Sequence, residues 1–174
     1  MAEHAARYER FSDILVREDI AVYAHDLRGH GYTSAIDSQR GLFASKDGLA
    51  KVIEDHDYVV EDISQKFTHT PIFCFGHSPG SILILNYAIR HPSKLHGMVC
   101  WNSGVETGAL ARLGKFILGV ESLIRDDTKT SLIAWNLTFG SWNAKFKPNR
   151  TDFDWLSRDK AQVDAYVADP FVRV

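Results

Sequence analysis

The sequence predicts an α/β fold: a parallel sheet with helices on both faces, followed by a helical segment. Short continuous apolar runs alternate with longer amphipathic stretches as far as Gly104, which is typical of parallel strands joined by helices. Beyond Gly104, apolar residues recur only at helical spacing. With 174 residues, 45% of them apolar, the chain is long enough to form a substantial core.

The elements expected up to Gly104 follow the order αβαβαβ. Helices are predicted where apolar residues recur at three- or four-residue spacing, as they do from Leu49 to Phe67. Strands are predicted from short continuous apolar runs such as "PIFCF". In chain order we expect a helix at 5–17, a strand at 20–27, a helix at 45–67, a strand at 71–75, a helix at 80–90 and a strand at 95–104.

The helical segment covers residues 105–174. Apolar stripes at 110–124 and 135–146 predict helices, and the second stripe is rich in aromatic residues. The stretch "WLSRDKAQVDAYVADP" predicts a further helix, with Asp154 or Ser157 near its start and an Asp-Pro pair after its end.

Composition limits the classes of partner. The formal net charge of −2 and the scattered Lys and Arg residues argue against binding to nucleic acid. No apolar run approaches the roughly 20 residues that span a bilayer, and the first residues lack the pattern of a secretion signal. We therefore expect a cytoplasmic protein without stable membrane insertion. Cys74 and Cys100 lie in apolar runs and are expected to be reduced thiols, and no metal or cofactor is expected.

The most informative motif is Gly76-His77-Ser78-Pro79-Gly80, which fits the pattern G-x-S-x-G between a predicted strand and a predicted helix. In this context the glycines allow a sharp turn, the nucleophile elbow, which exposes the serine above the carboxyl end of the strand. The N-terminal dipole of the following helix then acts at the same place. Ser78 is therefore the candidate nucleophile, and the alternative is a Gly-Ser turn without chemistry.

Together with this motif, longer blocks of the chain resemble α/β-hydrolases of the lysophospholipase, monoacylglycerol lipase and serine aminopeptidase type. The blocks are "MAEHAARYERFSDILVREDIAVYAHDLRGHGYTS", "GHSPGS" and "RTDFDWLSRDKAQVDAYVADP". The resemblance implies a partial α/β-hydrolase core at 1–104 and an incomplete helical cap at 105–174. It also implies a serine hydrolase of small-molecule or lipid esters, in which Ser78 attacks, a His takes its proton and an Asp orients that His.

Parts of the family's pattern are absent from these 174 residues. Family members carry a strand ending in His-Gly before the segment that starts here at Met1, and they carry the triad Asp and His after the cap. The resemblance therefore predicts a chain truncated at both ends, with a gap in the sheet between the strands at 20–27 and 71–75. The alternatives to an active hydrolase are a non-catalytic relic of the family and a fold completed by a second polypeptide.

The histidines that follow Ser78 do not fit the role of the absent base. His91 lies thirteen residues on, about 20 Å along a helix, whereas hydrogen-bond reach is about 3 Å. His96 begins the next predicted strand, at the end remote from Ser78. Both histidines are therefore expected to be structural.

Pro79 weakens the expected oxyanion hole. In the family, one donor is the N–H of the residue after the nucleophile, and another comes from the position that resembles Met1. Proline has no N–H, and the loss of one oxyanion donor typically costs about 10²–10³ in turnover. The N–H of Gly80 or a bound water is the expected substitute. Pro79 is nevertheless favourable at the first position of a helix.

The expected substrate pocket includes His77, next to the nucleophile, and Trp135 and Phe139 from the aromatic stripe. The apolar stripes could pack the cap and line an acyl-chain pocket, pack the cap alone, or face a membrane. We favour the first and packing alone next. Membrane docking is least favoured, because the polar face carries Arg112, Lys115 and Arg125 but too few cations for firm binding to anionic lipid.

Overall fold

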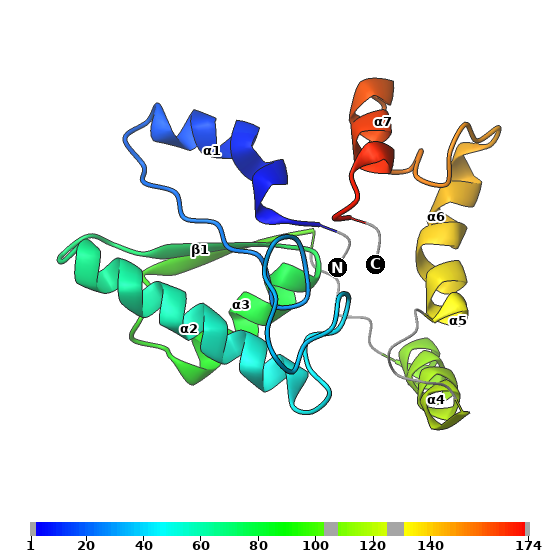
Figure 1. Ribbon diagram of the computed structural model, residues 1–174, viewed down its shortest axis with the longest axis horizontal. Helices are drawn as coiled ribbons and strands as arrows, with labels where there is room; N and C mark the ends of the chain where they lie inside the picture. The colour runs from blue at the N-terminus through cyan, green and yellow to red at the C-terminus, as the bar shows by residue number, and fades with distance from the viewer. Residues whose placement is uncertain (1–2, 103–107, 125–130, 173–174) are drawn as a thin grey trace. The chain divides into compact units, whose positions relative to one another are not determined.

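The computed structural model describes residues 3–102, 108–124 and 131–172. Helices predominate, and the regular strands are short (Figure 1). In chain order the elements are η1 (Ala5–Tyr8), α1 (Glu9–Val16), α2 (Gly48–Lys66), β1 (Phe73–His77), α3 (Pro79–Arg90), β2 (Gly97–Trp101), α4 (Ala109–Ile124), α5 (Leu132–Trp135), η2 (Asn136–Gly140), α6 (Ser141–Asn143), η3 (Ala144–Phe146) and α7 (Lys160–Ala168).

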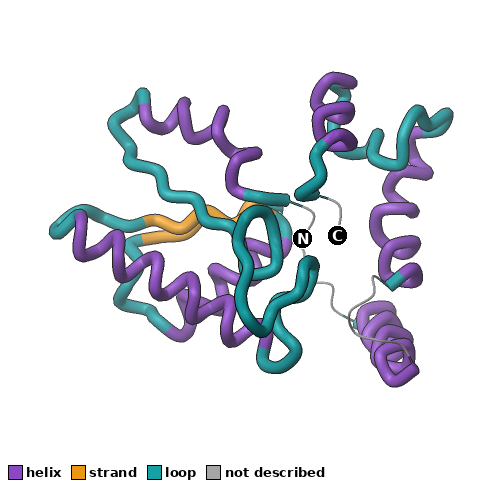
Figure 2. The backbone as a smooth tube through the Cα atoms, in the orientation of Figure 1, coloured by secondary structure: helices purple, strands orange, loops and turns teal. Residues whose placement is uncertain are grey.

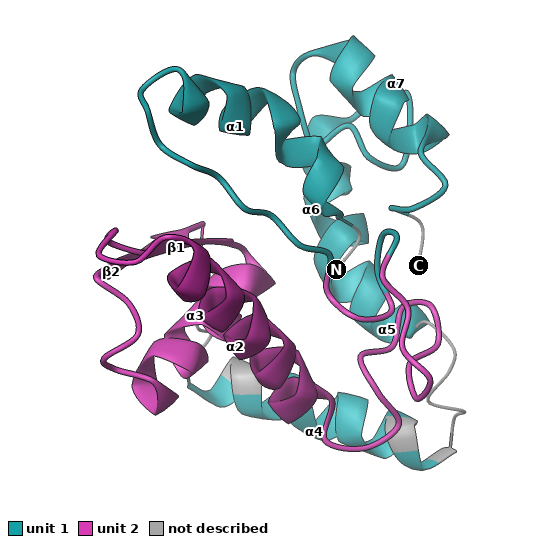
Figure 3. Cartoon of the chain, turned by 60° about the vertical axis from the view of Figure 1, so that its left-hand side comes forward, with its two compact units in different colours: residues 1–26, 30–32, 107–174 teal, residues 27–29, 33–106 magenta. Residues whose placement is uncertain are grey.

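The chain divides into two compact units, which Figure 3 distinguishes by colour. Unit 1 consists of Met1–Asp26, His30–Tyr32 and Thr107–Val174, and unit 2 consists of Leu27–Gly29 and Thr33–Glu106. These units are interleaved in the sequence, whereas the expected core and cap are continuous. The division at residue 104 therefore stays a prediction.

Unit 2 contains the parallel sheet that the sequence predicts. β1 and β2 lie side by side, with Phe73 opposite Gly97 and His77 opposite Trp101 (Figure 2). β1 begins at Phe73, later than expected. Before it, the Ile72 N–H donates to His96 Nδ1 at 3.1 Å, and the Ile72 carbonyl oxygen accepts the His96 N–H at 2.8 Å. The strand then continues as far as the residue before Ser78, so the sheet ends directly at the candidate nucleophile.

The core of unit 2 lies between α2, α3 and one face of β1. The alternation of the strand places Cys74 and Gly76 on this buried face, while Phe73 and Phe75 on the other face are 65% and 41% exposed. The sheet–helix packing fixes the position of α3 and hence of the residue that precedes it. The buried members of this cluster are Val52, Ile53, Val60, Cys74, Leu83, Ile84 and Tyr87.

The prediction of a strand at 20–27 is wrong. These residues have no regular secondary structure, and Ile20 and Tyr23 are each 49% exposed. A strand requires a neighbour to accept and donate its backbone hydrogen bonds. Within the described ranges no residue pairs with this segment, so its apolar sequence does not form a ladder.

The turn after this segment depends on a carboxylate and a glycine. Asp26 accepts hydrogen bonds from the backbone N–H groups of Ala5, at 2.6 Å, and Tyr32, at 2.8 Å. Gly31 has a φ of +54°, and a Cβ added there would lie 2.3 Å from Asp26 Oδ2. Asp26 therefore joins the N-terminal segment of unit 1 to a turn that only glycine can form.

The helical segment of unit 1 contains the expected helices, with one different boundary. α7 begins at Lys160 because Asp159 accepts the Ala161 N–H at 2.9 Å as its N-cap. Ser157 lies near this start, as expected, and its Oγ accepts the Asp159 N–H at 3.1 Å. The Asp154 carboxylate instead accepts hydrogen bonds within a preceding turn. No helix in the described parts of the chain combines the length and apolar character needed to cross a membrane.

Candidate active site

Ser78 has the backbone conformation of a nucleophile elbow. It lies between the last residue of β1 and the first residue of α3, with φ +56° and ψ −121°. A non-glycine residue in such a conformation is strained and persists only where its surroundings hold it. The Ser78 N–H donates to the carbonyl oxygen of Trp101 at 2.9 Å, which attaches the turn to the end of β2.

The two glycines of the motif have different structural requirements. A Cβ added to Gly76 would lie 2.5 Å from the carbonyl oxygen of Gly80 and 2.8 Å from the nitrogen of Ser81. β1 and the first turn of α3 therefore approach too closely for any side chain at position 76. A Cβ added to Gly80 would meet no described atom within 4 Å, so its neighbourhood in the described structure is open.

Ser81 is a site residue that the sequence analysis did not identify. Its side chain is buried, and its Oγ lies 2.6 Å from the Gly76 carbonyl oxygen and 3.1 Å from that of Trp101. The hydroxyl has a single proton, which these two acceptors share. The sequence feature that could have identified Ser81 is a serine in the first turn of the helix after the elbow. A hydroxyl at this position can reach carbonyl oxygens at the strand ends.

The first turn of α3 also determines which backbone donors are available. Pro79 occupies the first helical position, where its lack of an N–H is tolerated. The Gly80 N–H forms no hydrogen bond with a described residue. It lies at the N-terminus of α3, where the helix dipole is positive. Gly80 is thus available as an oxyanion donor. The second expected donor, at Met1, lies outside the described residues.

No described residue forms a hydrogen bond with the Ser78 hydroxyl, and the histidines that follow Ser78 have other contacts. His91 stacks on Tyr87 with ring centroids 4.7 Å apart, at the far end of the 12-residue α3. This corresponds to about 18 Å of helix. His96 Nδ1 accepts the Ile72 N–H, where the sheet begins. These contacts support the prediction that both histidines are structural.

The far end of α3 carries a charged network. Asp57 accepts hydrogen bonds from Lys94 Nζ at 2.7 Å and from the Tyr87 hydroxyl at 2.9 Å. The Lys94 bond, and then the Tyr87 bond, hold the pKa of Asp57 below its usual value, although burial opposes them. Burial, and then the hydrogen bond to Asp57, raise the pKa of Tyr87. The network joins α2 to α3 without approaching the strand ends.

A cavity of about 350 Å³ lies at the same end of unit 2. Phe67, Ile72, Lys94 and His96 are among its lining residues, and none of the lining residues belongs to the elbow. The cavity therefore does not mark the place where Ser78 would act.

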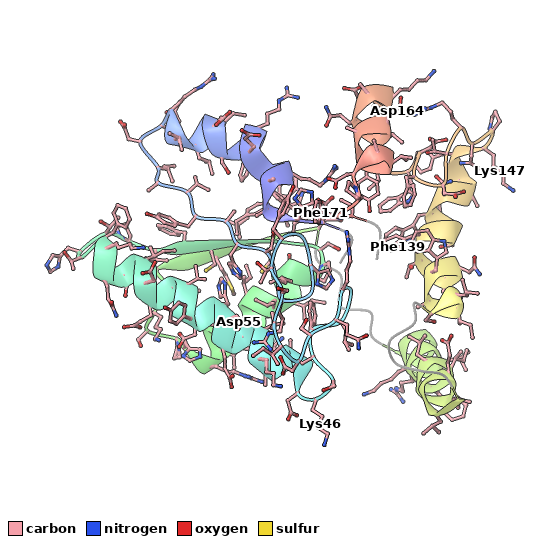
Figure 4. The ribbon with its side chains drawn as sticks, in the orientation of Figure 1. Lys46, Asp55, Phe139, Lys147, Asp164 and Phe171 are labelled. Atoms are coloured by element: carbon pink, nitrogen blue, oxygen red, sulfur yellow. The ribbon has the colours of Figure 1, made fainter. Side chains whose placement is uncertain are left out.

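The other expected pocket residues lie in two different settings. His77 ends β1 next to Ser78 and is partly buried. Trp135 and Phe139 belong to unit 1, where their ring centroids are 4.9 Å apart, and Phe139 also stacks on Trp155 at 5.3 Å. Figure 4 labels Phe139. They form part of an aromatic cluster that also contains Trp142, Phe153 and Tyr166. Their contribution to a substrate pocket stays a prediction.

A parallel sheet that ends in a strained serine at the start of a helix defines the α/β-hydrolase class. The family model described as serine aminopeptidase, S33, matches residues 1–174. The chain belongs to this family.

Curated relatives and solved structures agree with this assignment. Monoglyceride lipase of Mus musculus is 28% identical over 170 residues, covering 98% of this chain and 49% of that protein. Monoacylglycerol lipase of Mycolicibacterium smegmatis is 28% identical over 171 residues, covering 98% of this chain and 53% of that protein. The chain spans about half the length of these curated relatives.

The fold is similar to those of solved hydrolases. A thermostable carboxyl esterase from Bacillus coagulans in complex with glycerol matches with a TM-score of 0.82 at 24% identity, over 98% of this chain and 55% of that one. The monoacylglycerol lipase of Paleococcus ferrophilus matches with a TM-score of 0.64 at 25% identity, over 99% of this chain and 56% of that one. The structure is consequently that of a partial α/β-hydrolase fold.

Proposed function

We propose that this chain carries the nucleophile of a serine hydrolase that cleaves carboxylic esters of glycerol or related lipids. The observation that carries the proposal is the conformation of Ser78, which is strained and placed at the junction of β1 and α3. Such strain is found at functional sites because the surrounding structure has to maintain it. Asp47 also has a positive φ, of +55°, but with ψ +32° it lies in the left-handed helical region. Ser78 differs from it by its ψ of −121°.

The proposed reaction follows the usual course of acyl transfer. Ser78 Oγ attacks the ester carbonyl carbon while its proton passes to a base, and the Gly80 N–H stabilises the resulting oxyanion. Collapse of the tetrahedral intermediate breaks the ester C–O bond and releases the alcohol, which takes the proton from the base. Water then hydrolyses the acyl-serine. This sequence needs no metal or cofactor.

We propose that the base and the acid that orients it come from polypeptide outside residues 1–174. Two observations support this: no described residue is bonded to the Ser78 hydroxyl, and the chain spans only about half of its relatives. In the described structure β1 pairs with β2 alone, so the other edge of β1 is able to receive a further strand. That strand comes either from the same gene product or from a second polypeptide.

The proposed substrates are monoacylglycerols, because relatives that cover 98% of this chain are named as lipases of this class. Trp135 and Phe139 are the proposed lining of the acyl-chain pocket, since their aromatic cluster offers apolar surface. Lysophospholipids are the closest alternative substrates. A cytoplasmic location is also proposed, because Cys74 and Cys100 are both free thiols.

The nucleophile is tested with a fluorophosphonate probe and a short p-nitrophenyl ester. Because the proposed base lies outside residues 1–174, we expect the probe to label Ser78 of the purified chain only slowly. The Ser78→Ala variant is expected to lose this labelling completely. Ser64→Ala is the matched control, because its hydroxyl donates only to a carbonyl within α2. Labelling of the Ser78→Ala variant at the rate of the parent chain would refute the role of Ser78.

Ester hydrolysis distinguishes the complete enzyme from the non-catalytic alternative. Turnover of the ester that disappears in Ser78→Ala supports a working hydrolase, whereas labelling without turnover supports a chain that needs its base from elsewhere. Comparison of a monoacylglycerol with an aminoacyl p-nitroanilide separates lipase from peptidase activity. Preference for the anilide would contradict the proposed substrate class.

A further inference from the structure

The elbow of this chain is held by a side chain as well as by backbone. Ser81 is 1% exposed and lies in the first turn of α3, three residues after Ser78. Its hydroxyl donates to the Gly76 carbonyl at 2.6 Å and to the Trp101 carbonyl at 3.1 Å. Gly76 belongs to β1 and Trp101 ends β2, so this hydroxyl connects both strands to α3.

The Trp101 carbonyl is shared between the nucleophile and Ser81. It accepts the Ser78 N–H at 2.9 Å and the Ser81 hydroxyl at 3.1 Å. Because both bonds converge on one oxygen, loss of the Ser81 hydroxyl would leave the Ser78 N–H as the remaining link between this carbonyl and the elbow. The strained φ of +56° at Ser78 would then have less support.

Pro79 makes the Gly80 N–H important for the expected oxyanion hole. The N–H of the residue after the nucleophile is the usual oxyanion donor, and proline has none. Gly80 does have an N–H, but this group forms no hydrogen bond with the described residues. The buried hydroxyl of Ser81 satisfies the carbonyl oxygens of the strand ends without using the Gly80 N–H.

We propose that Ser81 is a positioning residue for the proposed hydrolase. Its hydroxyl maintains the conformation of Ser78 and satisfies Gly76 and Trp101, so that the Gly80 N–H stays available for the oxyanion. The catalytic consequence rests on the proposed function, but the conformational consequence does not. Ser81 does not itself contact substrate in this scheme.

The test compares Ser81→Ala with Ser81→Thr, which retains the hydroxyl, and with the control Ser64→Ala. The first readout is the rate constant for fluorophosphonate labelling of Ser78 at equal fractions of folded protein, measured by urea unfolding. We expect Ser81→Ala to lower this rate by about 10- to 100-fold, because small displacements of a nucleophile have effects of this size. Ser81→Thr is expected to restore most of the rate.

The second readout is independent of reactivity. The Ser78 Cα and Cβ chemical shifts report its backbone conformation, and the Gly80 amide shift and exchange rate report its hydrogen bonding. We expect these signals to change in Ser81→Ala and to stay near those of the parent chain in Ser81→Thr and Ser64→Ala.

The two readouts separate the two proposals. Equal labelling of the parent chain and Ser78→Ala, with shifts that respond to Ser81→Ala, would refute the nucleophile and support the positioning role. A labelling rate within about two-fold of the parent in Ser81→Ala, or unchanged Ser78 and Gly80 signals, would overturn the positioning role. An equal loss of labelling rate in Ser81→Ala and Ser81→Thr would also contradict the positioning role, since packing and not the hydroxyl would then be responsible.

Discussion

The two ends of α3 are built from different interactions. At its start, Ser78 is held by backbone carbonyls, a buried hydroxyl and a glycine contact. At its end, Tyr87 is fully buried and donates to Asp57, which also binds Lys94. The start thus maintains a strained conformation, while the end joins α2 to α3 through charge and aromatic packing.

This difference indicates how stability and function are divided along the helix. A charged network far from Ser78 can stabilise the helix without disturbing the electrostatics of the nucleophile. Neutral donors at the start leave the Gly80 N–H and the Ser78 hydroxyl without a hydrogen-bond partner among the described residues. These are the groups that acyl transfer requires. Substitutions at the end should therefore change stability, whereas substitutions at the start should change reactivity as well.

The largest effect is expected for Gly76→Ala. The added methyl group would lie 2.5 Å from a backbone oxygen of α3, where no flexible side chain can move away. We expect a loss of about 3 kcal/mol or more in the free energy of unfolding, because overpacking against backbone is not relieved by rotamer changes. Urea unfolding measures this loss, and probe labelling of Ser78 should fall with it.

Gly80→Ala is the matched control for that variant. Its added methyl group would meet no described atom within 4 Å, so we expect a gain of about 0.5–1 kcal/mol from the better helix propensity of alanine. Comparable destabilisation by both substitutions would show that the two glycines are equivalent, contrary to the structure.

Much of unit 2 could be predicted from the sequence, because its signals are local. The G-x-S-x-G motif between an apolar run and an amphipathic stretch located Ser78 correctly at the junction of strand and helix. The Ser81 hydroxyl was not found, because its acceptors are a residue of β1 and the end of β2, and their proximity depends on the tertiary fold.

The strand expected at 20–27 shows where prediction from local sequence fails. Its apolar sequence satisfies the local criteria for a buried strand, but a ladder depends on a partner that local sequence does not specify. Asp159 shows a similar limit on a smaller scale. Several Asp and Ser residues near α7 are suitable N-caps, and the backbone geometry selects one of them.

A smaller effect is expected at the other end of α3. Asp57→Ala removes the acceptor of the Tyr87 hydroxyl, which would leave this fully buried donor unsatisfied. We expect a loss of about 2 kcal/mol in the free energy of unfolding, with little change in the rate at which folded Ser78 is labelled. Asp62→Ala, which removes an exposed pair with Lys66, is the control and should cost less than about 0.5 kcal/mol.

The Asp57 contribution should also depend on pH. Because the folded pKa of Asp57 is lowered by Lys94 and Tyr87, its stabilisation is present above the unfolded pKa of about 4. It is lost as the pH falls through the folded pKa. The difference in unfolding free energy between the parent chain and Asp57→Asn should therefore be larger at pH 7 than at pH 3. A difference that grows on acidification would contradict the assigned direction.

The smallest effect concerns the two thiols, which differ in burial although both lie in the sheet. Burial raises the pKa of Cys74 to about 11, and its Sγ lies 3.4 Å from His56 Nε2, whereas Cys100 is exposed. Since the thiolate is the reactive species, iodoacetamide at pH 8 should modify Cys100 at least about 10-fold faster than Cys74. Mass spectrometry of the digested protein measures both rates. Because Cys74 lies in the buried cluster joined to Tyr87 and Cys100 does not, Asp57→Ala should raise the Cys74 rate alone. A parallel rise at Cys100 would mean that the far end of α3 also supports β2, and the division between the two ends would then be wrong.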